Sequence, residues 1–335
     1  MFCLKTQSLH KVFLISALYA LLPAHLLAQE PGVGPVSIEG EVEDPLAPVR
    51  ERLGPGRSAL GPDRSYAKEG WSIEMGLDYG YVASASLKQG LGTVTEQAGE
   101  IGIVASRRLD EGLVGIVGGN WQTFSFGYNG SNIPLPNNLN TLNAILGCDI
   151  EIEPSEWYMR IQLEPGVYGT WQSLGWHQVN MPGVAAFTNI VNEDFQWFIA
   201  LRADIFQFFP VIPIPGIRWQ FAENWLLNGS APKPTIDWKA TDDLTVFVGG
   251  DILNANVRLA DSNPEVLGNR SLAGALVNYF EARIGAGVTW EVHPNLSLQA
   301  EGGSLVWRTY DFIRLNDHVT STMAPYFQVA IRGQF

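Results

Sequence analysis

Charged residues recur at every second position within several apolar segments of this chain, and they are its most chemically informative feature. The eight that lie deepest in these segments are Arg160, Glu164, Arg202, Asp204, Glu281, Arg283, Glu301 and Arg332. Because successive side chains of a β-strand point to opposite faces, the charges share one face and the apolar residues the other. Rings of ionised side chains set selectivity when they line a pore. The pattern is compatible with a narrow pore lined by these residues, and equally with a closed interior filled by mutually paired charges.

The residue types needed for catalysis are sparse. A serine hydrolase needs a histidine beside its serine, and after an N-terminal leader only His177, His293 and His318 remain, all in predicted loops or turns. The chain has no Gly-x-Ser-x-Gly motif and no His-containing cluster suited to a metal ion. We therefore predict no enzyme activity and no catalytic, metal or cofactor site.

The composition restricts the class of protein. Only 16% of the 335 residues are charged, whereas about 25% is usual for a soluble domain. The formal net charge is −13, which argues against a nucleic-acid partner because such a partner requires a basic face.

The N-terminus predicts export. Residues 1–28 combine basic residues at Lys5 and Lys11, an apolar run over 12–22 and a cleavage-like end at Ala28, which is typical of a signal peptide. The apolar run is too short for a membrane-spanning helix, which needs about 20 residues. Residues 29–70 are rich in Pro and Gly without apolar periodicity, and we interpret them as a flexible arm on the periplasmic side.

Residues 71–335 read as successive strands, of which 279–292 shows the longest unbroken alternation. The chain has no other long apolar stretch, so a membrane-embedded form must be a closed sheet, whose backbone groups are all paired. Tryptophans near strand ends match the aromatic girdles of membrane barrels. We predict an all-β, transmembrane, antiparallel up-and-down β-barrel of about 12 strands, or 14 if residues 172–235 hold an extra pair.

The two faces of each strand can be assigned from energy. An arginine facing lipid at mid-bilayer costs about 2–4 kcal/mol, so the charged faces must point inward and the apolar faces toward lipid. An arginine placed at Val329 or Ile284 should then block insertion, whereas one at Gln328 should be tolerated. A phase slip near Gly303 predicts a β-bulge.

The last strand carries an assembly signal. Phe327, Val329, Ile331 and Phe335 share its apolar face, and the sequence ends on an aromatic residue. This strand resembles the C-terminal strand of bacterial outer-membrane barrels, which the barrel-assembly machinery recognises. The resemblance implies that machinery and outer-membrane lipid as partners, and export to the cell outer membrane of a Gram-negative bacterium.

A longer part of the chain, roughly residues 71–335, resembles a family of outer-membrane β-barrel proteins of unknown function. The similarity lies in residues 215–219, 232–244, 248–251 and 324–335. It implies the fold and the location but no activity, solute or surface partner.

Three functions from different classes remain open at this point. The first is a narrow passive channel for small solutes. The second is a plugged structural or adhesion barrel whose outer loops, 172–192 and 260–277, bind a partner. An outer-membrane hydrolase is a remote third.

Overall fold

The computed structural model describes residues 70–335, apart from 131–132, 154–155, 172–174, 264, 268–269 and 316. These residues belong to one compact unit, Asp44–Phe335. The predicted signal peptide, 1–28, and all but the last residue of the predicted arm, 29–70, lie outside the described residues. No helix in the described part of the chain is long and apolar enough to cross a membrane.

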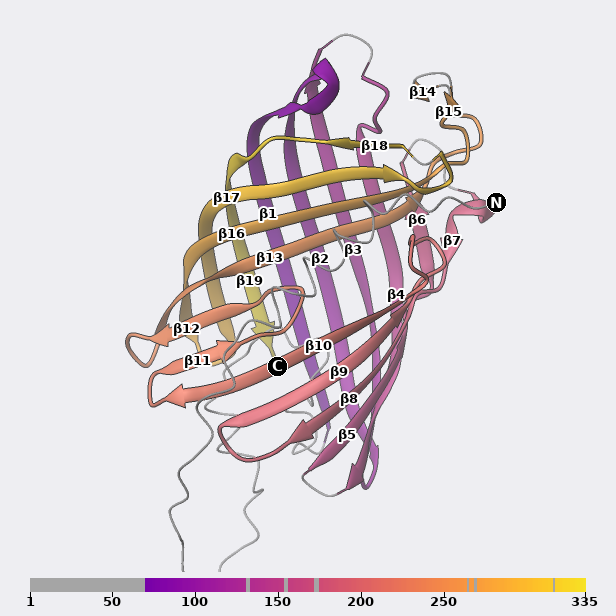
Figure 1. The fold of residues 1–335 in the computed structure, drawn as a ribbon. Coiled ribbons are helices and arrows are strands. Elements are labelled where there is room, and N and C mark those ends of the chain that lie inside the picture. Colours follow the sequence, from indigo (N-terminus) through magenta and orange to yellow (C-terminus); the bar gives the residue numbers. More distant parts are fainter. Residues whose placement is uncertain are drawn as a thin grey trace, which may run out of the picture. The chain divides into compact units, whose positions relative to one another are not determined.

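Fourteen antiparallel wall strands form a barrel, which closes because β1 pairs with both β2 and β19 (Figure 1). The strands are β1 (Trp71–Leu87), β2 (Gly92–Asp110), β3 (Leu113–Asn129), β4 (Asn138–Glu153), β5 (Trp157–Leu163) continued by β6 (Gly166–Gly169), β7 (Val179–Asn180) continued by β8 (Gly183–Ile190), β9 (Phe195–Ala203), β10 (Val211–Ala222), β11 (Trp225–Asn228), β12 (Thr235–Lys239), β13 (Leu244–Arg258), β16 (Leu276–His293), β17 (Leu296–Phe312) and β19 (Ala324–Gln334). The all-β barrel is therefore confirmed, with the larger of the two predicted strand numbers.

The remaining elements are short and lie in the connections. They are the 3-10 helices η2 (Lys88–Gly90), η3 (Trp176–Gln178) and η4 (Ile313–Leu315), the pair β14 (Val266–Leu267) and β15 (Arg270–Ser271), and β18 (Asp317–Thr320), which adds to β17.

The extra strand pair does lie within residues 172–235. One strand beyond the twelve predicted is β8, which lies in a segment whose sequence lacks clear alternation. The other arises because residues 225–239 form a hairpin, β11–β12, rather than one strand. Pro232 and Pro234 lie in its connection, where a residue without an N–H cannot continue a strand ladder.

Connection lengths distinguish the two ends of the barrel. We call the end with the short turns, such as 111–112, 223–224 and 294–295, the turn end, and the end with the longer connections, such as 204–210 and 259–275, the loop end. A twelve-strand count would place the short 223–224 turn among the long connections. Fourteen strands place it at the turn end with the others.

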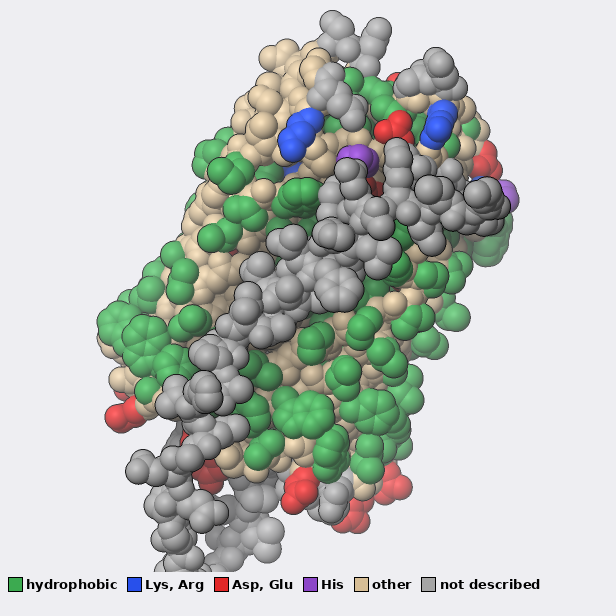
Figure 2. Space-filling model, in the orientation of Figure 1, with side chains coloured by type: hydrophobic (Ala, Val, Ile, Leu, Met, Phe, Trp, Pro, Cys, Tyr) green, Lys and Arg blue, Asp and Glu red, His purple; other side chains and the backbone are tan. Residues whose placement is uncertain are grey.

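The predicted apolar faces point outward. Ile284 is 55% exposed and Phe327 is 50% exposed on strands whose alternate residues are buried, and hydrophobic side chains cover much of the visible wall (Figure 2). At the turn end Trp157 packs edge-on against Trp197, with ring centroids 5.6 Å apart. An apolar outer wall with aromatic residues near a strand end is the surface of a membrane barrel.

The predicted β-bulge lies in β17, a few residues beyond Gly303. Ala282 pairs with Trp307 and Arg283 with Leu305, so Val306 is the inserted residue. Leu305 is consequently buried inside the barrel, whereas Trp307 is exposed on its outer wall. The same shift turns Arg308 inward, where it is 1% exposed.

Candidate functional site in the barrel interior

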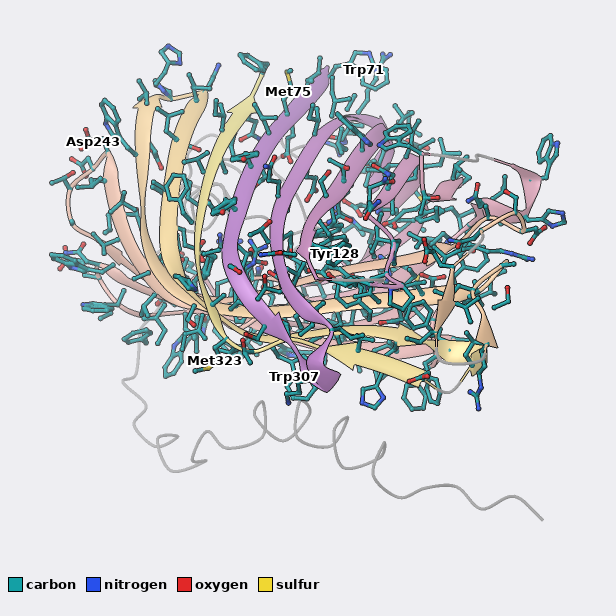
Figure 3. All side chains as sticks on the ribbon, turned by 90° about the horizontal axis from the view of Figure 1, so that it is seen from above. Trp71, Met75, Tyr128, Asp243, Trp307 and Met323 are labelled. Atoms are coloured by element: carbon teal, nitrogen blue, oxygen red, sulfur yellow. The ribbon has the colours of Figure 1, made fainter. Side chains whose placement is uncertain are left out.

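The interior has two zones along the barrel axis. Toward the loop end, inward side chains pack into one buried group, which we call the loop-side core; its members include Val82, Val94, Phe124, Phe126, Leu139, Val257, Tyr279, Leu305, Tyr310 and Phe312. The Tyr279 ring lies 5.0 Å from that of Phe124 and 5.1 Å from that of Tyr310, between centroids. In Figure 3 Tyr128 points into this interior, whereas Trp71 and Trp307 lie on the outside. These rings pack against one another inside the barrel.

Four charged residues lie buried within the loop-side core and contact the hydroxyl of its Tyr279 or one another. We call these five residues the ion-pair cluster: Glu96 of β2, Tyr279, Glu281 and Arg283 of β16, and Arg308 of β17. The side chains of all four charged members are 0% exposed. Arg283 Nη2 lies 3.2 Å from Glu96 Oε1, and its Nε donates to Glu281. Arg308 Nε lies 3.1 Å from Glu281 Oε2, and its Nη2 donates to Glu96.

Tyr279 links the two carboxylates of the cluster. The Tyr279 hydroxyl lies 2.6 Å from Glu96 Oε2 and also contacts Glu281. Arg308 Nε lies 3.1 Å from the Tyr279 hydroxyl oxygen and donates to it. Two carboxylates and two guanidinium groups carry no net charge together. A buried charge is tolerated only when it is paired and hydrogen-bonded, and here each charge has several partners. The side-chain contacts of the cluster therefore link β2, β16 and β17 through the barrel interior.

Three inward arginines outside the loop-side core are also paired. Arg160 makes a two-pronged contact with Asp149, with both oxygens 2.6 Å from its nitrogens. Arg202 Nη2 lies 3.1 Å from Glu164 Oε2, and Arg332 Nη2 lies 2.5 Å from Asp78 Oδ1. Together with the cluster, these pairs leave the interior nearly balanced in charge at the positions the sequence singles out.

Glu301 completes the set of predicted interior charges. Lys233, in the β11–β12 connection, donates to its carboxylate, and so does the Tyr326 hydroxyl. A short connection of the wall therefore reaches the interior face of β17.

Inward positions toward the turn end include both buried and partly exposed residues. Val114, Tyr158 and Ile190 form a small buried cluster there, whereas Gly102, Gly287 and Gln299 are partly exposed although they point into the barrel. A small cavity of about 20 Å³, with room for about one water molecule, has a lining that includes Asp78, Glu100, Phe124, Arg283 and Gln328. The turn-side interior is therefore less completely buried than the loop-side core.

Six of the eight predicted charges lie on inward faces of wall strands, Glu164 lies in the break between β5 and β6, and Asp204 does not lie on a strand. β9 ends at Ala203, and the buried Asp204 carboxylate accepts from Asn180 Nδ2 at 2.7 Å and Asn256 Nδ2 at 2.9 Å. Its prediction as a strand residue facing the interior is therefore wrong. It instead connects the β9–β10 connection to β7 and β13.

Several charged residues of the interior are not among the eight predicted. They include the buried Arg218 and Asp251, as well as Glu96, Arg308 and Lys233 of the contacts described above. Glu96 lies in β2, within residues 83–97, whose sequence favours a connection rather than a strand. Arg308 is concealed by the bulge in β17. Lys233 lies between two prolines, in a connection rather than a strand.

The histidines are not arranged for acyl transfer. His177 lies in η3, 3.7 Å from Asp261, and the two side chains are 71% and 56% exposed. His293 is the last residue of β16, where its Nδ1 accepts from the backbone N–H of Asn295. Within the described residues no group of three or more His, Cys, Asp or Glu side chains could hold a metal ion.

No protein-family model matches the chain, and no curated protein matches it in sequence. Among solved structures, the chain is similar to an outer membrane channel from Pseudomonas putida F1, with 9% identity and a TM-score of 0.45 over 82% of this chain and 100% of that one. It is also similar to a Pseudomonas aeruginosa FadL homologue, with 10% identity and a TM-score of 0.42 over 80% and 91% of the two chains. A third similar structure is the KdgM porin, with 9% identity and a TM-score of 0.32 over 78% of this chain and 99% of that one.

Proposed function

We propose that this chain is an integral outer-membrane protein that acts as a narrow passive channel for small solutes. The observation that carries the proposal is the contrast between the two interior zones. At the turn end several inward positions, among them Gly102, Gly287 and Gln299, are partly exposed beside a small buried cluster, whereas at the loop end the inward side chains pack into one large buried core. The ion-pair cluster sits in that core, and we assign it the role of holding the passage narrow.

The charge pairing supports weak ion selectivity. Arg160, Arg202 and Arg332 each lie against a carboxylate, and the ion-pair cluster is neutral. Fixed charges select ions through their uncompensated field. We therefore expect cations and anions to pass at similar rates.

Planar-bilayer recording of the purified, refolded protein tests this function. The wild-type protein should give small, brief conductance steps above the lipid background. Glu96→Gln combined with Arg308→Met removes one charge of each sign, keeps the cluster neutral and abolishes the Glu96–Arg308 ion pair, so it should give larger and longer steps. Asp149→Asn with Arg160→Met is the matched control, because it neutralises a pair outside the loop-side core, and it should conduct like wild type. If neither the wild type nor the cluster variant conducts above background, the channel is rejected.

Exposed apolar residues at the loop end favour a second candidate, a structural or adhesion barrel. Trp176 is 88% exposed, Ile205 is 74% exposed and Phe208 is 53% exposed. One hydrogen bond, from Asn180 to Asp204, joins the two segments that carry these residues. Residues 183–190 form the wall strand β8, so the predicted partner loop 172–192 cannot be deleted whole, whereas residues 259–275 form a true connection. Trp176→Ser with Phe208→Ser should abolish adhesion to a surface partner and leave bilayer conductance unchanged, if this candidate is correct.

A further inference from the structure

Polar side chains gather on the inward face of β1 to β4, four wall strands that lie side by side (Figure 1). We call this surface the polar patch; its members are Asp78, Glu100, Asn120, Gln122, Thr141 and Asn143. Asn120 of β3 lies opposite Asn143 of β4, and Gln122 lies opposite Thr141. Glu100 of β2 pairs with Gln122 on one side and with Asp78 of β1 on the other. Because directly opposite residues of antiparallel strands share one face, these side chains form a continuous surface.

Glycines leave space beside the polar patch. Gly102 of β2 lies between Gly76 of β1 and Asn120 of β3 in one cross-strand row. A Cβ at position 102 would lie 3.5 Å from Asn120 Oδ1, so a side chain there would rest against that oxygen. Asn120 Oδ1 is buried and has no hydrogen-bond partner among the described residues. A buried acceptor without a partner is unfavourable, and a hydroxyl group bound above Gly102 would supply the missing hydrogen bond.

The small cavity of the interior lies at the border of the polar patch. Asp78, Glu100 and Gln122 line the cavity from the patch, and Arg283 and Phe124 line it from the loop-side core. Its volume of about 20 Å³ has room for about one water molecule, and therefore for one hydroxyl group of a larger molecule. Carboxylate and amide oxygens accept hydrogen bonds, whereas amide nitrogens and the guanidinium donate them. The cavity thus suits a hydroxyl group, which both donates and accepts.

The charge and the accessibility of the polar patch distinguish between classes of solute. Most of its members are uncharged, and the Asp78 carboxylate lies 2.5 Å from Arg332 Nη2. Glu100, Asn120 and Gln122 are partly exposed, so a solute in the turn-side interior can reach them. An apolar solute would bury these groups without hydrogen bonds, which is unfavourable. A neutral solute with its own donors and acceptors is the better match.

We infer that the polar patch binds a neutral solute rich in hydroxyl groups, such as a small polyol or a monosaccharide, during its passage through the barrel. The inference rests on the proposed channel and names its solute class and binding surface. One hydroxyl group enters the cavity, and neighbouring hydroxyl groups exchange hydrogen bonds with Asn120 and Gln122. Each amide offers donors and an acceptor side by side, as vicinal hydroxyl groups require. Such hydrogen bonds replace bonds to water, so their net gain is modest, and the solute can leave again.

Saturation-transfer NMR of the refolded protein in lipid nanodiscs tests the patch, because it detects contact between protein and solute without transport. The titrated probes are glucose, the cationic glucosamine, the anionic glucuronate and the less polar cyclohexanol. Asn120→Leu with Gln122→Leu removes two amides of the patch, whereas Gly102→Val covers Asn120 Oδ1 and removes no polar group. Gln220→Leu with Gln299→Leu is the matched control, because these amides also point inward and are partly exposed, but on β10 and β17. Protease resistance shows that each variant is folded.

We expect glucose to bind the wild type and the control variant alike, and both patch variants about tenfold more weakly, because its hydroxyl groups lose their partners there. The other three probes should bind the wild type no better than glucose does. Unchanged affinity in the patch variants, an equal loss in the control variant, or a preference for another probe overturns the inference. Binding is measured without current, so glucose binding by a barrel that never conducts rejects the channel and keeps the patch, whereas conductance without glucose binding does the reverse.

Discussion

Replacing Arg308 alone with methionine should lower the free energy of unfolding of the barrel by about 3–5 kcal/mol, because removing one partner of a buried ion pair leaves a charge without compensation. Glu96 and Glu281 would then share only Arg283, in a cluster whose charged side chains are 0% exposed. Urea unfolding of the refolded protein in lipid vesicles, followed by tryptophan fluorescence, measures the loss. Lys239→Met is the control, since the Lys239–Asp242 pair is exposed and such pairs contribute about 0–1 kcal/mol.

The double variant Glu96→Gln with Arg308→Met should recover much of that loss. It restores equal numbers of buried charges of each sign, and a neutral or apolar replacement of a buried pair is often tolerated. The two single variants and the double variant form a double-mutant cycle, whose coupling energy isolates the Glu96–Arg308 contact. If the double variant is as unstable as the sum of the single variants, the two residues are not coupled and the cluster does not act as a unit.

Local alternation predicted the faces of the strands correctly because one face meets lipid and the other does not. Ile284, Phe327 and Phe335 lie outside as expected, and Glu281 and Arg283 lie inside. The prediction was weakest where the backbone leaves the period of two. The bulge in β17 concealed Arg308, and Glu96 lies where the sequence favours a connection, although these two residues supply two of the four charged members of the ion-pair cluster.

The unpaired edge of β10 could not be inferred from periodicity, because it depends on which distant strands pair: among the described strands, none pairs with residues 211–216 on the side away from β9. The prolines within residues 209–215 favour a connection, yet 211–215 belong to β10. Pro213 and Pro215 carried the relevant signal: alternating prolines within an otherwise apolar strand indicate an unpaired edge. Recognising that edge requires knowing that the β11–β12 hairpin ends at Asn228 and Thr235, which is a fact about tertiary pairing.

Position 328 is a poor inward control for the arginine substitutions, because its surroundings do not suit an arginine. Gln328 does point inward, but it is 6% exposed and its Oε1 lies 3.3 Å from Arg283 Nη1. An arginine there would be held against the cationic Arg283 without water to screen the two charges. Gln299 is the better inward control, because it is partly exposed and its amide nitrogen lies 3.5 Å from Glu301 Oε2.

Val329→Arg should therefore prevent most of the chain from folding into bilayers, whereas Gln299→Arg should fold with nearly wild-type yield. Val329 is 37% exposed on the outer wall of β19, and this strand closes the barrel by pairing with β1 and β17. An arginine on the lipid face near mid-bilayer costs about 2–4 kcal/mol, a large share of a total stability of about 5–15 kcal/mol. An arginine at 299 faces the turn-side interior and a carboxylate instead. The folded fraction of each variant after dilution into vesicles, scored by protease resistance, compares the two faces directly, and similar yields would show that the outer wall of β19 does not meet lipid.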